Sequence, residues 1–202
     1  MTISAIFFDV GGVLGTNGWD RHDRLAVATA FDLDYDEMEE RHDLVSAAFE
    51  TGHLDLDGYL DAVIFHDERP FSRESFWDAM TARSQPREDA LQIATDLKDT
   101  GRYFMATLNN ESHELNDFRI EHFGLRERFD VFLTSSYLGV KKPDDAIFGL
   151  ALHITARKPG ECVFIDDREL NIKAAVRHGM RTIHYRDVEQ LRTGLIEAGV
   201  AF

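Results

Sequence analysis

The strongest constraint on the fold is a regular alternation of short apolar runs and longer amphipathic stretches that begins after Pro86. The short runs predict strands, and the stretches, with apolar residues at helical spacing, predict helices. The predicted strands are Tyr103–Leu108, Val131–Thr134, Cys162–Ile165 and Thr182–Tyr185, and the predicted helices are Ala90–Lys98, Glu111–His122, Asp144–His153, Leu170–His178 and Val188–Ala198. This alternation favours βαβ units and a parallel sheet.

The N-terminal part of the chain departs from this pattern. Ile3–Val10 is an apolar run ended by Gly11-Gly12, which predicts a buried strand followed by a tight turn. Residues from about 19 to 89 have helical spacing without a strand pattern. We therefore predict an α/β fold, a doubly wound parallel sheet with an all-helical cap inserted after its first strand. The predicted core is residues 1–15 and 88–202, and the predicted cap is residues 16–87.

Charge and cysteine content exclude several classes of function. The chain carries 22 basic and 37 acidic residues, and a net charge of -15 disfavours binding to nucleic acid or anionic membranes. The single cysteine, Cys162, rules out an internal disulfide and a cysteine-based zinc cluster. No apolar run approaches the roughly 18 residues of a membrane span, and Asp9 interrupts the N-terminal run too early for a signal peptide. We expect a cytoplasmic protein, and the sequence predicts no oligomeric state.

Polar residues stand where the predicted strands end. They are Asp9, Asn109, Asn110, Asp166 and Asp167, with Lys142 in the connection after the Val131–Thr134 strand. Taken singly, they have structural explanations as turn residues, helix caps or a solvated lysine. Taken together, they mark the edge where a parallel sheet binds its ligand. Carboxylates suit Mg²⁺ and a lysine suits an anion, so the group predicts phosphoryl transfer.

Three segments resemble motifs of the haloacid dehalogenase-like hydrolases. Ile6–Leu14 resembles the first motif, Lys142-Pro143-Asp144 the third, and Phe164–Ala175 with Gly179 the fourth. The resemblance covers the whole chain, including a small helical cap, and is closest to the phosphatase-type branch. It implies a Rossmann-like core, a magnesium ion, and an aspartate nucleophile that forms a phospho-enzyme.

The resemblance also implies a role for each matching residue. Asp9 would be the nucleophile and a metal ligand, and Lys142 would steady it and neutralise the transferring phosphoryl group. Asp167 would bind the metal directly, whereas Asp166 would be either a ligand or an outer-shell acceptor. The backbone of Gly11 would contribute a carbonyl ligand and contact the phosphate.

The first motif departs from the family pattern at one position. Phosphatases of the family usually carry an acid two residues after the nucleophile, and this chain has Gly11 there. Loss of general acid catalysis typically costs about 10²–10⁴-fold in rate, so we expect a preference for aryl or acyl phosphates over alkyl phosphates. His22 and Glu111 are candidate substitutes for the acid. Gly11→Asp would restore it only if the position does not need the positive φ that glycine allows.

The second motif usually presents Ser or Thr at the end of its strand. That place falls on Asn109, whose amide can donate to a phosphate oxygen, with Asn110 beside it. If the register is shifted, Thr107 takes the role from mid-strand. Trp19, Asp20, Arg21 and His22 follow the first motif, and either line the entrance or begin a solvent-facing helix.

The predicted function is therefore a magnesium-dependent phosphatase that acts on a small phosphorylated metabolite. Two alternatives remain open at this point. One is a metal-independent hydrolase acting at carbon, as in the dehalogenases, and the pair Asp166-Asp167 argues against it. The other is a binding or regulatory module that lost turnover with Gly11.

Overall fold

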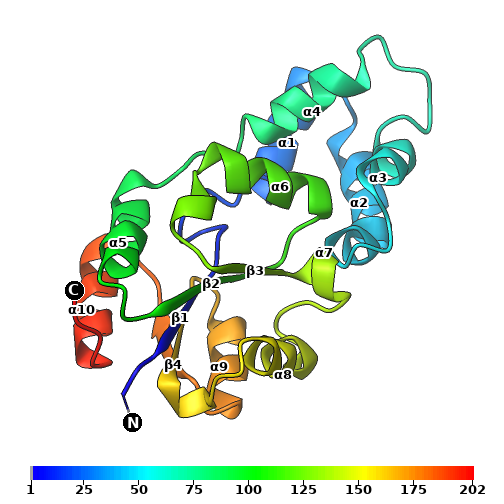
Figure 1. Cartoon of the computed structure of the whole chain (residues 1–202). Coiled ribbons are helices and arrows are strands. Elements are labelled where there is room, and N and C mark those ends of the chain that lie inside the picture. Colours follow the sequence, from blue (N-terminus) through cyan, green and yellow to red (C-terminus); the bar gives the residue numbers. More distant parts are fainter. Residues whose placement is uncertain (1) are drawn as a thin grey trace.

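The computed structural model describes residues 2–202, and its centre is a 5-stranded sheet in which all neighbouring strands are parallel (Figure 1). The strands are β1 (Ala5–Phe8), β2 (Phe104–Asn109), β3 (Val131–Thr134), β4 (Cys162–Asp166) and β5 (Arg181–His184). Their order is β3-β2-β1-β4-β5, so the chain reverses its direction of growth across the sheet beside β1. The predicted doubly wound α/β fold is confirmed, and such a reversal is where this class of sheet places its ligands.

Helices cover both faces of the sheet. They are α5 (Glu88–Asp99), α6 (His113–His122), α7 (Ser135–Leu138), α8 (Asp145–Ile154), α9 (Glu169–Arg177) and α10 (Val188–Glu197), with short 3₁₀ turns at Leu125–Glu127 and Pro159–Glu161. Because successive strand residues point to opposite faces, Ile6 and Phe8 pack with α5 and α10, whereas Ala5 and Phe7 pack with α8 and α9. β1 and β4 are buried on both faces, which explains their continuous apolar sequences.

The segment 16–87, all of it described by the structure, contains helices and no strand. The helices are α1 (Arg21–Ala30), α2 (Tyr35–Glu50), α3 (Leu56–Val63) and α4 (Arg73–Thr81). Each begins at a residue whose side chain accepts a backbone N–H, namely Asp20, Asp34, Asp55 and Ser72. Their apolar residues form a third cluster, separate from the two on the sheet and rich in aromatic rings. We propose on this basis that 16–87 is a cap and that 1–15 and 88–202 form the core.

The two connections between this helical segment and the sheet lie side by side. Thr16 N–H donates to the Gln85 carbonyl at 2.9 Å, and Arg87 N–H donates to the Leu14 carbonyl at 2.9 Å. Gly15 pairs with Pro86 between them, and a Cβ on Gly15 would lie 2.5 Å from the Phe123 ring. The helical segment therefore leaves and rejoins the core at one place, just beyond the carboxyl end of β1.

A second contact fixes the helical segment over the sheet edge. The Ser135 hydroxyl of α7 donates to the Glu50 carbonyl at the end of α2, at 2.5 Å. The Glu50 carboxylate also pairs with Lys141 Nζ at 2.7 Å. α2 consequently lies close to α7 and to the connection that follows it (Figure 1).

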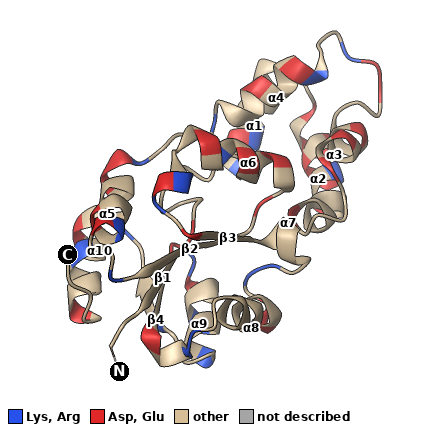
Figure 2. Ribbon diagram, viewed as in Figure 1, with Lys and Arg blue, Asp and Glu red and all other residues tan. Residues whose placement is uncertain are grey.

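The acidic residues are spread over many helices rather than gathered on one, as Figure 2 shows for α2, α4 and α6. Among residues 2–202, no helix is both long enough and apolar enough to cross a bilayer.

Candidate active site

Three carboxylates meet at the carboxyl ends of β1 and β4. Asp9 follows β1, Asp166 ends β4, and Asp167 comes next; one oxygen from each lies within 4.8 Å of the others. The two strands run in parallel register, with Phe8 beside Ile165, and Asp9 N–H donates to the Ile165 carbonyl at 2.9 Å. The register alone therefore brings these carboxylates together, although more than half of the chain separates them in sequence.

Lys142 extends its ammonium group into this cluster. Its Nζ lies 2.9 Å from Asp9 Oδ1 and 2.7 Å from Asp166 Oδ2, and the side chain is almost fully buried. Asn110 holds the lysine backbone on both sides, since its amide donates to the Lys142 carbonyl and accepts the Lys142 N–H, each at 2.8 Å. Asn110 thus positions the lysine that the sequence analysis placed beside the nucleophile.

Asp166 and Asp167 differ in how their oxygens are paired. Asp166 accepts from Lys142, from the Arg168 N–H at 2.8 Å and from the Asn171 amide at 3.0 Å. Asp167 Oδ1, in contrast, is buried and has no hydrogen-bond partner. A buried carboxylate oxygen without a donor fits a direct metal ligand, whereas the saturated Asp166 fits an outer-shell acceptor.

The electrostatics of the cluster favour an additional cation. Burial raises the pKa of Asp9 to about 8 against the opposing charge of Lys142, and Asp166 adds to the rise. Burial and the charge of Asp166 also raise the pKa of Asp167. Three carboxylates against one ammonium leave two negative charges unbalanced when all are ionised. A hard dication with oxygen ligands, such as Mg²⁺, matches both the charge and the donor set.

Two adjacent glycines border the carboxylates, and they have different constraints. Gly12 has φ of 80°, and a Cβ there would lie 2.3 Å from Asp167 Oδ2, so a side chain is excluded. Gly11 has no positive φ. The positive φ considered for position 11 in the sequence analysis is therefore wrong: that backbone conformation falls on Gly12.

A cavity of about 460 Å³, the size of a small-molecule site, opens above Asp9. Its sheet-side wall includes Gly11, Asn110 and Lys142, and its helical wall includes Trp19, His42 and Phe49. Asp20 and Arg21 also line it, as the sequence analysis considered. His22 is not among the lining residues; it lies at the start of α1 and is exposed.

A family model for haloacid dehalogenase-like hydrolases matches residues 3–179. The chain belongs to this family. The hydrolase class inferred from the motifs is thereby confirmed, and the match extends from β1 to the end of α9.

The individual relatives of this hydrolase have diverse activities. Bifunctional epoxide hydrolase 2 of Rattus norvegicus is 36% identical over 117 residues, 56% of this chain and 21% of that protein. The GMP/IMP nucleotidase YrfG of Escherichia coli is 31% identical over 107 residues, 51% of this chain and 48% of that protein. The matches thus span about half or less of these curated relatives.

Solved structures show the same fold at low sequence identity. A HAD family enzyme from Bacteroides thetaiotaomicron, in complex with magnesium and inorganic phosphate, matches with a TM-score of 0.78 and 22% identity, over 91% of this chain and 94% of that chain. The L-2-haloacid dehalogenase from Xanthobacter autotrophicus, with chloropropionic acid covalently bound, matches with a TM-score of 0.64 and 17% identity, over 100% of this chain and 85% of that chain.

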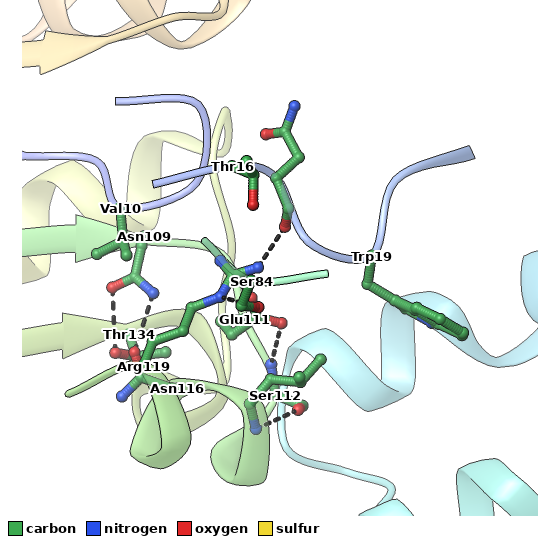
Figure 3. Close-up of polar contacts among 12 residues, drawn as sticks. Val10, Thr16, Trp19, Ser84, Asn109, Glu111, Ser112, Asn116, Arg119 and Thr134 are labelled. Atoms are coloured by element: carbon green, nitrogen blue, oxygen red, sulfur yellow. Dashed lines mark hydrogen bonds and ion pairs between the residues drawn. The ribbon is translucent and has the colours of Figure 1, made fainter. Parts of the chain in front are cut away.

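In this hydrolase, the residue at the end of the second motif strand faces away from the cavity. The Asn109 amide donates to Asn116 Oδ1 of α6 at 3.0 Å and accepts from the Thr134 hydroxyl at 3.3 Å (Figure 3). Asn109 is absent from the cavity lining, whereas Asn110 is present in it. Thr107 is buried in mid-strand, and its hydroxyl has no partner. The predicted phosphate-binding roles of Asn109 and Asn110 remain predictions.

The helical wall of the cavity contains a chain of hydrogen bonds. Trp19 Nε1–H donates to the Tyr59 hydroxyl at 2.8 Å, and that hydroxyl lies 2.8 Å from His42 Nδ1. Since the Tyr59 oxygen accepts from Trp19, its own proton is available for His42. Burial, assisted by the charge of Arg24, lowers the pKa of His42 to about 4, consistent with a neutral ring that accepts this proton.

The cavity wall also contains a buried arginine that was not predicted from the sequence. Arg119 of α6 is 2% exposed, and its Nη1 pairs with Glu111 Oε2 at 2.9 Å (Figure 3). Both residues line the cavity. Arg119 follows the buried Leu115 by one helical turn, so the helical spacing of the sequence could have placed it on the inward face of the helix.

Proposed function

We propose that this hydrolase is a magnesium-dependent phosphatase that acts on a small phosphorylated metabolite through an aspartyl-phosphate. The observation that carries the proposal is the cluster of buried Asp9, Asp166 and Lys142 with half-buried Asp167, in which one buried carboxylate oxygen of Asp167 is left unpaired. Support also comes from a relative that is a GMP/IMP nucleotidase and from a structural neighbour solved with magnesium and phosphate.

The residues suited to hold the metal are Asp9, Asp167 and the carbonyl of Gly11, with Asp166 in the outer shell. Mg²⁺ bound there would offset the excess negative charge and polarise the phosphoryl oxygens. The chain itself fixes the nucleophile: Asp9 Oδ1 accepts the Val10 N–H at 2.8 Å and pairs with Lys142. These two contacts orient the carboxylate before substrate arrives.

In the first step, an Asp9 oxygen forms a bond to phosphorus as the bond between phosphorus and the leaving oxygen breaks. Lys142 neutralises part of the phosphoryl charge, and Asn110 keeps the lysine in place. In the second step, water attacks the phospho-aspartate, which releases phosphate and regenerates the Asp9 carboxylate. The size of the cavity restricts the substrate to a small molecule.

The test is a screen of phosphorylated metabolites with magnesium and with a chelator. We expect magnesium-dependent release of inorganic phosphate by the unsubstituted protein. Asp167→Ala should abolish it and weaken magnesium binding in a titration by more than the roughly 10–100-fold typical of outer-shell changes. Asp145→Ala, at an exposed aspartate of α8, is the matched control and should behave like the unsubstituted protein.

The outcomes separate the three functions considered. Turnover that survives the chelator and the Asp167→Ala change would assign the protein to the metal-independent hydrolases. Magnesium-dependent binding of a phosphorylated ligand without turnover would assign it to the binding or regulatory modules. Unchanged magnesium affinity in Asp167→Ala would place the metal elsewhere.

A further inference from the structure

The space beside Gly11 is filled by a guanidinium group. A Cβ built on Gly11 would lie 3.3 Å from Arg119 Nη1 and 3.4 Å from Asn17 Oδ1. Any acid carried at position 11 would therefore extend directly toward Arg119. Where the resemblance to phosphatases leads one to expect a carboxyl group, this chain presents a cation.

Arg119 is held in place from three directions (Figure 3). Nε donates to the Ser84 hydroxyl at 3.2 Å, Nη2 donates to the Asn17 carbonyl, and Nη1 pairs with Glu111 at 2.9 Å. Gly18 permits this approach, since a Cβ there would lie 2.4 Å from Nη2. These three contacts fix the orientation of the planar guanidinium before any substrate binds.

Arg119 has N–H donors beyond those used by Glu111, Ser84 and Asn17. Nη1 carries two N–H groups, and the pair with Glu111 uses one of them. Arg119 lines the cavity together with Asp9, and Nη1 is the guanidinium atom nearest to Gly11, two residues beyond Asp9. A buried, charge-assisted donor of this kind is stronger than the same donor in water.

We propose that Arg119 donates a hydrogen bond to the leaving oxygen and stabilises it as an anion, in place of an acid that would protonate it. This inference rests on the proposed phosphatase function and gives the expected preference for aryl and acyl phosphates a structural cause. The substrates are phosphate esters or anhydrides whose leaving group departs as a stabilised oxyanion, such as a phenolate, an enolate or a carboxylate. Glu111 is a positioning residue in this arrangement, since it holds Nη1.

The proposed step balances without proton transfer. The Asp9 oxygen bonds to phosphorus, the bond from phosphorus to the leaving oxygen breaks, and the electron pair stays on that oxygen. Arg119 donates a hydrogen bond and transfers no proton. The oxyanion departs in its hydrogen bond to Arg119 and takes a proton from water afterwards, if its basicity requires one.

A series of aryl phosphates with increasingly basic leaving groups tests the proposal. Dinitrophenyl, p-nitrophenyl and phenyl phosphate are compared, with magnesium, for the unsubstituted protein and for Arg119→Gln. A charge-assisted hydrogen bond corresponds to about 10- to 100-fold in rate, so we expect a loss of this size for phenyl phosphate. The loss for dinitrophenyl phosphate should be no more than several-fold, since that phenolate needs little stabilisation.

Two further variants test whether a loss of rate comes only from a disturbed structure. Arg128→Gln removes another partly buried arginine that contacts backbone carbonyls outside the cavity, and should change all three rates equally or not at all. If Arg119→Gln does not fold, Arg119→Lys retains the charge without the planar fork. It should show the same dependence on the leaving group, with a smaller amplitude.

The results distinguish failure of this inference from failure of the proposed function. A loss that is equal for all leaving groups in the Arg119 variants overturns the role of Arg119 and leaves the phosphatase assignment standing. Absence of magnesium-dependent turnover in the unsubstituted protein overturns the phosphatase assignment, and this inference with it. A loss that grows with the basicity of the leaving group supports both.

Discussion

The two walls of the cavity differ in the residues that form them and in the contacts that hold those residues in place. The sheet-side wall presents Asp9 and Lys142 in direct contact, and Asp166 pairs with the same lysine behind them. The parallel register of β1 and β4 holds the two aspartates side by side. The helical wall adds the aromatic rings of Trp19 and Phe49 to charged residues such as Arg24, and packing between helices holds it. Behind it, Trp19 donates a neutral hydrogen bond to Tyr59. From this comparison we expect the sheet side to carry the proposed chemistry in a fixed geometry and the helical wall to set the preference among substrates.

The largest expected effect comes from removing one charge on the sheet side. Asp9→Asn keeps the shape of the nucleophile but not its charge, and we expect turnover to fall on the order of 10⁴-fold or more. Beryllium fluoride, which mimics an aspartyl-phosphate, should form no adduct with the variant, as measured by fluorine NMR. On the helical side, Trp19→Phe should change the relative rates of different substrates without abolishing turnover. Normal turnover by Asp9→Asn would refute the covalent mechanism.

The second prediction concerns stability and the neutral histidine of the helical wall. Burial lowers the pKa of His42 to about 4 from an ordinary value of 6.5, so the unfolded chain binds more protons than the folded one between these values. The free energy of unfolding should therefore decrease as pH falls through this window. The contribution of His42 between pH 7 and pH 5 is roughly 1–2 kcal/mol.

Urea denaturation at the two pH values measures this contribution as the difference between the unsubstituted protein and His42→Gln. The charged groups that act on His42 are Arg24, Glu39, Asp43 and Glu50; Arg24 lowers its pKa, and the carboxylates raise it. His153→Gln, at an exposed position of α8, is the control and should keep the full pH dependence. An unchanged pH dependence in His42→Gln would show that the ring does not need to be neutral.

The smallest expected effect sharpens the assignment of the second motif. The Thr107 hydroxyl is buried without a partner, so Thr107→Val should stabilise the protein by roughly 1 kcal/mol. Thr107 does not line the cavity, and activity should stay at the unsubstituted level. Thermal unfolding and phosphate release measure the two quantities. A large loss of activity would transfer the phosphate-binding role from Asn109 to Thr107.

Much of the fold and of the sheet-side wall could be predicted because local sequence determines them. The alternation after Pro86 predicted β2 to β5, the strand ends marked Asp9 and Asp166, and Lys142 stood in the connection after β3. In a parallel sheet, the carboxyl ends of all strands lie at the same edge, so residues that follow neighbouring strands are close in space. The proximity of Asp9 and Asp166 could therefore be predicted without knowledge of packing.

The remaining features depend on contacts between distant segments. The direction of the Asn109 amide is set by Asn116 and Thr134, which lie on other elements. Arg119 of α6 is held at the cavity by hydrogen bonds to Ser84 and Asn17, which lie at the two ends of the helical segment. No local pattern encodes such meetings, so sequence reasoning could name Glu111 but not its partner.

The close approach of Arg119 to Gly11 also limits which single substitutions could give this protein an acid at position 11 during evolution. An aspartate at position 11 would compete with Glu111 for Nη1, so the replacement alone would bring an ion pair rather than a free acid. Recovery of a proton-donating carboxyl would require Arg119 to change as well, and Arg119 also ties down both ends of the helical segment. The benefit of each substitution therefore depends on the other, which is an epistatic coupling between positions 11 and 119.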